Sequence, residues 1–117
     1  MPKINIKVTL ITPDLIEEKT YPALFHSTQN QIIYQEKDKT ITKVDLAQAK
    51  LRRENEELWM EYSFDESMPT TGYVKIKKLN QKVLLNLNTK KIIKEKKKFE
   101  INYQVENQDY KYTLEVI

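Results

Sequence analysis

Apolar and polar residues alternate with a period of two through most of this chain of 117 residues. Successive side chains of a β-strand point to opposite faces, so each alternating set lines one apolar face of a sheet. Burial on a single face is typical of antiparallel sheets, because parallel strands covered on both sides have continuous apolar runs. The alternating stretches are residues 4–10, 58–64, 74–76, 83–87, 99–105 and 112–116. We therefore predict an all-β protein.

Turn-forming residues separate these stretches, with further strands expected within 15–25 and 31–37. Residues 65–72 contain Pro69 and the only glycine, Gly72, so they are expected to form a longer loop. Pro22 cannot donate a backbone hydrogen bond, so it belongs at an edge or a bulge. The even spacing predicts a single antiparallel meander over 1–117, arranged as a sandwich or a barrel.

Residues 44–57 are the exception, because they are rich in strong helix formers. Asp45 is a suitable helix cap, and local propensity slightly favours a short helix near 45–57. A hairpin with its turn near 54–56 is an alternative, and a short helix over 45–49 followed by a strand is a third.

Several classes of site are excluded by composition. The chain has no cysteine, which rules out disulfides, iron–sulfur clusters and zinc–thiolate sites. With one histidine and one glycine it lacks the patterns of metal sites and of glycine-rich phosphate loops, so we expect no cofactor and no metal. No apolar run approaches the ~18 residues of a membrane span, and no signal peptide is evident, so we expect a cytoplasmic protein.

Positive charge is concentrated in the C-terminal part of the chain. Residues 1–70 carry a net charge of −3 and residues 71–117 a net charge of +6. A basic patch of this kind can meet nucleic acid or another anionic partner, and it can equally be a solvated hairpin. Its densest part consists of Lys90, Lys91, Lys94, Lys96, Lys97 and Lys98.

No set of residues predicts catalysis. A nucleophile needs a base within hydrogen-bond reach, and His26 is the only histidine. The adjacent carboxylates at 17–18 and 56–57 point to opposite faces of a strand, so they do not share a proton. We predict that the protein is not an enzyme.

Several short segments together resemble a bacterial family of calycin-like barrels of unknown function, typified by YwiB. They are residues 33–36 (Ile-Tyr-Gln-Glu), a basic strand ending at Arg53, 58–64, 71–73 (Thr-Gly-Tyr), 87–89 (Leu-Asn-Thr), 99–103 and 110–116. Two glycines of the family pattern are missing, one replaced by Asn55 and one expected between residues 79 and 82. The resemblance implies a closed antiparallel calycin-like barrel of about 8–10 strands and favours a strand over 44–53, but it implies no activity.

A barrel of this size either is filled by side chains or holds one small ligand. Arg53 faces inward if Arg52 faces outward, and a buried arginine needs a partner such as Glu36, a tyrosine or a ligand carboxylate. The candidate ligand-binding residues are Arg53, Tyr34, Glu36, Tyr62 and Tyr103. We expect a small apolar or carboxylate-bearing ligand in the barrel, with nucleic-acid or anionic-partner binding through residues 75–98, or pairing at an exposed strand edge, as alternatives.

Overall fold

The computed structural model describes residues 2–117, and within this range it contains ten β-strands and no helix. The strands are β1 (Lys3–Ile11), β2 (Ile16–His26), β3 (Gln31–Gln35), β4 (Ile41–Asp45), β5 (Lys50–Glu54), β6 (Leu58–Ser63), β7 (Thr70–Ile76), β8 (Gln81–Glu95), β9 (Lys98–Val105) and β10 (Gln108–Val116). No helix of the described residues could therefore cross a membrane.

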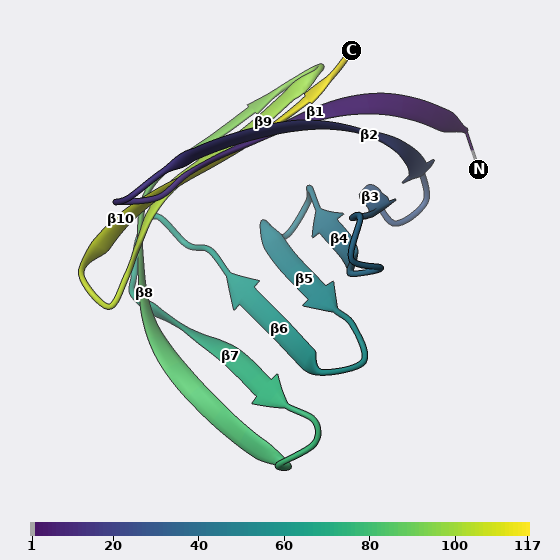
Figure 1. Cartoon of the computed structure of the whole chain (residues 1–117). Coiled ribbons are helices and arrows are strands. Elements are labelled where there is room, and N and C mark those ends of the chain that lie inside the picture. Colours follow the sequence, from purple (N-terminus) through teal and green to yellow (C-terminus); the bar gives the residue numbers. More distant parts are fainter. Residues whose placement is uncertain (1) are drawn as a thin grey trace.

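Consecutive strands pair antiparallel, and β10 pairs with β1, so the meander closes into a barrel. The predicted all-β fold and the predicted barrel of about 8–10 strands are confirmed. Figure 1 shows the long strands β1, β2, β9 and β10 arching over the short strands β3–β6. The interior between these two walls contains the core.

The long strand β8 connects the two walls, because it pairs with β7 along its first half and with β9 along its second half. Its register with β9 shifts between Thr89 and Lys91. An extra residue of this kind bends a strand and increases its twist. The bulge therefore lies at the point where β8 passes from one wall to the other.

The predicted helix over 45–57 is wrong, because these residues form the end of β4, a turn, β5 and a second turn. Asp45 accepts a hydrogen bond from the backbone N–H of Gln48 at 2.9 Å, as a helix cap does. Ala49, however, has a φ of 53°, in the left-handed region that an α-helix cannot continue through.

Tertiary pairing explains why helix propensity fails here. β5 lies between β4 and β6, with Leu51 buried in the core. The ladder hydrogen bonds and the burial of one leucine outweigh propensity differences of a few tenths of a kcal/mol per residue. The hairpin alternative is confirmed, since the turn between β5 and β6 covers residues 55–57.

The glycine prediction needs a correction, because Gly72 lies inside β7 and the loop before it ends at Pro69. A Cβ atom on Gly72 would lie 2.7 Å from Cδ1 of Tyr62 and 3.2 Å from Cδ1 of Leu87. Both distances are shorter than ordinary van der Waals contact. Gly72 therefore leaves room for the Tyr62 ring to lie across β7.

Asparagines occupy two turns of the barrel where the resemblance led us to expect glycine. Asn80 adopts a φ of 50° in the turn between β7 and β8, which asparagine tolerates better than most residues. Asn55 does not use a left-handed conformation. Its Oδ1 instead accepts hydrogen bonds from the backbone N–H groups of Glu57 and Leu58, both at 2.8 Å. The tight turns thus form without glycine.

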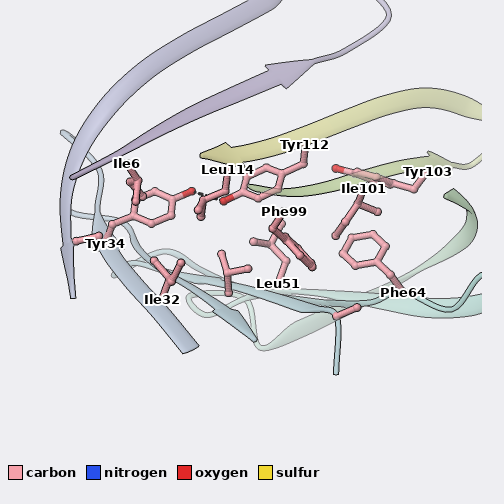
Figure 2. Packing of buried hydrophobic residues seen from close by; sticks show 13 residues of the cluster. Ile6, Ile32, Tyr34, Leu51, Phe64, Phe99, Ile101, Tyr103, Tyr112 and Leu114 are labelled. Carbon is pink, nitrogen blue, oxygen red and sulfur yellow. Dashed lines mark hydrogen bonds between the residues drawn. The ribbon is translucent and has the colours of Figure 1, made fainter. Parts of the chain in front are cut away.

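The alternating residues point into the barrel as predicted, and those near its centre are fully buried. Ile6, Leu87, Ile101 and Leu114 are each no more than 1% exposed. Figure 2 shows the core side chains of both walls meeting in the middle of the barrel, where Tyr34 and Tyr112 reach toward each other. The centre is therefore packed, and space remains only toward the two ends.

Two hairpins extend past their neighbours at one end of the barrel. The ladder between β2 and β3 ends at Ala23, directly after Pro22, so residues 16–22 of β2 pair only with β1. Likewise, β9 pairs with β8 only from Leu87 onward. Within residues 2–117, no strand covers the outer edge of 81–85. The predicted edge position of Pro22 is confirmed, and we name this end the mouth.

Candidate functional site

A cavity of about 400 Å³, here called the mouth cavity, opens at the mouth of the barrel. It is lined by inward-facing residues of seven strands and by Glu36 just after β3, because every second residue of each strand points inward. Apolar side chains such as Leu51, Met60 and Val105 form part of its wall. Six tyrosines complete it: Tyr21, Tyr34, Tyr62, Tyr103, Tyr110 and Tyr112.

A buried hydrogen bond between two tyrosines lies at the inner end of the mouth cavity. The hydroxyl oxygens of Tyr34 on β3 and Tyr112 on β10 are 2.8 Å apart, and both residues are 5% exposed. The dashed line in Figure 2 marks this contact across the barrel. It separates the mouth cavity from the packed core beneath it.

Aromatic rings contact one another along the wall. Tyr103 stacks on Tyr110 with ring centroids 5.6 Å apart, and Phe64 packs against Tyr103 at 4.8 Å. Tyr21 stacks on Tyr34 at 4.9 Å. Contacts of this kind restrict the positions of the rings in the cavity wall.

Arg53 and Glu36 form a bidentate ion pair in the mouth cavity. Nε of Arg53 donates to Oε2 of Glu36 at 3.0 Å, and Nη2 donates to Oε1 at 2.9 Å. The hydroxyl of Thr42, which is fully buried, donates to the same carboxylate at 2.8 Å. Burial alone would lower the pKa of Arg53, but the charge of Glu36 and its hydrogen bonds raise it overall. The inward arginine thus has the structural partner that the sequence suggested.

Burial favours the neutral form of several tyrosines of the mouth cavity. It raises the pKa of Tyr34 to about 12, although the hydrogen bond with Tyr112 lowers it somewhat. Burial also raises the pKa of Tyr62, of Tyr103 and of Tyr112, in each case as the largest cause. These hydroxyl groups therefore act as hydrogen-bonding groups rather than as bases.

All five candidate residues, Arg53, Tyr34, Glu36, Tyr62 and Tyr103, line the mouth cavity. Sequence reasoning missed Tyr21, Tyr110, Glu17 and Lys19, which lie there too. Tyr110 has the same phase as Tyr112 on β10, so alternation could have identified it. Glu17 and Lys19 could not be found in this way, because the inward face of β2 near the mouth is polar.

The six lysines of the basic segment do not gather at one place. Lys90 and Lys91 lie together beside β10, where Nζ of Lys90 is 3.2 Å from Oδ1 of Asp109. Lys94, Lys96, Lys97 and Lys98 lie around the turn between β8 and β9, at the end of the barrel opposite the mouth. Nucleic-acid binding through these residues stays a prediction.

A second cavity, of about 430 Å³, lies at that opposite end and is here called the base cavity. Its walls are apolar, with Ile32, Leu46 and Leu114 among them, and its polar lining consists of the four lysines of the turn, Glu95 and Asn30. The core separates it from the mouth cavity, so the barrel has two separate hollows.

The remaining titratable candidates lie apart from one another. His26 is at the end of β2, where its Nδ1 is hydrogen-bonded to the hydroxyl of Thr28 at 3.0 Å. Glu17 faces the mouth cavity, whereas Glu18 points outward to Nζ of Lys7 at 3.3 Å, as strand geometry predicted. Within residues 2–117, no three histidine or carboxylate side chains come together as metal ligands.

The fold is similar to that of a solved bacterial protein. The ywiB protein from Bacillus subtilis superimposes with a TM-score of 0.70 over 96% of this chain and 88% of that chain, at 18% sequence identity. The resemblance inferred from short motifs is thus confirmed for the fold, and the chain has the YwiB barrel. No protein-family model matches the chain. The curated proteins contain no match to it in sequence.

Proposed function

We propose that this protein is a non-enzymatic binding module that holds one small, largely apolar ligand in the mouth cavity. The observation that carries the proposal is a preformed hollow of about 400 Å³ with six tyrosines in its wall. Ligand pockets are typically concave, roughly 300–1,000 Å³ in volume, and apolar with a few polar groups. The mouth cavity fits this description.

The side chains of the cavity favour a flat ring with a hydrogen-bonding group. Tyrosine offers an apolar face for stacking and a hydroxyl for a hydrogen bond. The charged groups of the lining balance, since Glu17 and Glu36 face Lys19 and Arg53. A ligand carboxylate could contact Arg53 through Nη1, because Nε and Nη2 already bind Glu36. A strongly charged ligand is therefore less suited to this cavity than a neutral one.

The state of the charged pair supports a binding role over catalysis. A general base or acid must be positioned to exchange a proton with a substrate. Glu36 instead accepts three hydrogen bonds from Arg53 and Thr42, so its carboxylate oxygens are already engaged within the protein. We place this binding activity in the cytoplasm, in keeping with a chain that has no cysteine.

Native mass spectrometry of the protein, purified without denaturation from a bacterial host, tests the proposal. We expect a bound small molecule that disappears in Val105→Trp, because the indole would fill the mouth cavity that Val105 lines. Leu84→Trp is the matched control, since Leu84 is 59% exposed and lies outside the cavity. A ligand retained equally by both variants would refute binding at the mouth.

A further inference from the structure

The base cavity has a chemistry unlike that of the mouth cavity. Its wall is built from the opposite ends of the strands and contains aliphatic and phenyl side chains in place of tyrosines. The apolar members are Ile4, Phe25, Ile32, Leu46, Phe99, Leu114 and Val116. A surface of this kind favours hydrocarbon, because apolar area removed from water lowers the free energy.

The rim of the base cavity is strongly basic. Four lysines and one carboxylate, Glu95, lie within five consecutive residues of the turn between β8 and β9. Nζ of Lys94 donates to the backbone oxygen of Ala47 at 3.1 Å, so the turn lies against the loop between β4 and β5. This contact places the turn beside the apolar wall, with Lys94, Lys96 and Lys97 exposed at its rim.

Of the four lysines, only Lys98 forms an ion pair with a carboxylate of residues 2–117. Nζ of Lys98 is 3.7 Å from Oε1 of Glu100. In contrast, Lys96 and Lys97 form no ion pair with any carboxylate of residues 2–117. Adjacent like charges repel one another, and a bound anion would relieve that repulsion. The rim thus has unused capacity for a negatively charged group.

We propose that the base cavity binds an unbranched aliphatic chain with an anionic head group. The chain lies against the apolar wall, and the head group contacts Lys96 and Lys97. Charge and apolar surface meet at one place, and this combination matches an amphiphile better than it matches a purely polar anion. This inference does not depend on the proposed function, because it concerns the other end of the barrel.

Decanoate is the probe, and its binding to the full chain is measured by calorimetry and by methyl NMR. We expect shifts at Ile4, Ile32, Leu46, Leu114 and Val116, which line the base cavity, and none at the methyl groups of the mouth cavity. Affinity should rise about fourfold per methylene from hexanoate to decanoate, as burial of hydrocarbon requires. Decyltrimethylammonium has the same chain with a cationic head and should not bind.

Charge variants separate a specific site from general attraction to a basic protein. The double variant Lys96→Gln with Lys97→Gln should weaken decanoate binding about tenfold. The variant Lys90→Gln with Lys91→Gln makes the same change in net charge beside β10 and should leave the affinity unchanged. Equal weakening by both variants would overturn the proposal.

The source of the amphiphile can be distinguished with anionic phosphatidylglycerol vesicles. If the ligand is a free amphiphile, decanoate should bind in solution and should compete with any attachment of the protein to vesicles. Attachment to vesicles without binding of decanoate would contradict the proposal, because the lysines would then serve a membrane surface. Equal binding of decanoate and decyltrimethylammonium would also contradict it, since the head group would have no role.

Discussion

The hydroxyl groups of Tyr34 and Tyr112 share a buried hydrogen bond of 2.8 Å although 78 residues separate them in the chain. This contact joins β3 to β10 across the barrel and closes the mouth cavity from below. The position of the cavity thus depends on the pairing of two polar groups within an otherwise apolar interior.

Tyr34→Phe should lower the free energy of unfolding by about 1–2 kcal/mol, because it leaves the Tyr112 hydroxyl buried without its partner. The double variant Tyr34→Phe with Tyr112→Phe should cost less than the sum of the two single variants, since neither hydroxyl is then orphaned. Urea denaturation of the four proteins provides the double-mutant cycle. Strictly additive losses would mean that the two hydroxyls do not interact.

Stability should fall at alkaline pH. Burial raises the pKa of Tyr34 from its ordinary value of 10.0 to about 12, so the native state holds this proton more tightly than the unfolded state. The raised pKa of Tyr34 contributes about 2–3 kcal/mol to the free energy of unfolding. This contribution is fully present below pH 10 and is lost as the pH rises through about 12. Burial also raises the pKa of Tyr103 and the pKa of Tyr112.

Urea denaturation at a series of pH values from neutrality upward measures this dependence, and Tyr34→Phe should reduce its slope. A free energy of unfolding that stays level from pH 10 to 12 would show that these tyrosines ionise as easily in the native state as in the unfolded chain.

Gly72→Ala should destabilise the protein by about 1–3 kcal/mol, because the new methyl group would overlap the Tyr62 ring. The displaced ring belongs to the wall of the mouth cavity, so the variant should also weaken ligand binding there. The double variant Gly72→Ala with Tyr62→Ala should be more stable than Tyr62→Ala alone. Thermal denaturation measures both effects, and a Gly72→Ala protein as stable as the parent would contradict the close packing.

Arg53→Met should cost about 1 kcal/mol, a modest value because the guanidinium is partly exposed and the pair is screened by salt. Adding Glu36→Gln should restore part of the loss, since the carboxylate no longer needs a partner. Arg52→Met is the matched control, because Arg52 binds Glu61 on the outside of the barrel and is half exposed. If urea denaturation shows equal losses for Arg52→Met and Arg53→Met, the inward pair has no special role.

Most of the barrel could be predicted from the alternation of apolar and polar residues, because a strand that is buried on one face carries an apolar residue at every second position. The helix expected near 45–57 shows where local reasoning fails. Most of its helix formers are surface residues, and Ala49 and Leu51 are the residues that it buries in the core. Strand pairing with β4 and β6 then decides the structure, and that pairing cannot be inferred from the segment itself.

The five candidate residues of the mouth cavity were accessible to sequence reasoning for a different reason. An arginine at an inward position needs a partner, and the inward acid and tyrosines of neighbouring strands are the available ones. Gly72 was misplaced because a glycine that leaves space for a ring looks the same in sequence as one that forms a turn. The base cavity was missed because its lysines come from one turn and its wall from several strands.

Methyl NMR with 2-naphthol, a neutral ring with one hydroxyl, tests the central claim most directly. We predict saturable shifts confined to the methyl groups of the mouth cavity and their loss in Val105→Trp. These methyl groups belong to Val8, Leu10, Leu51, Met60 and Val105. Shifts at Ile32, Leu46 and Leu114 of the base cavity, or shifts scattered over the outer surface, would contradict a ligand site at the mouth.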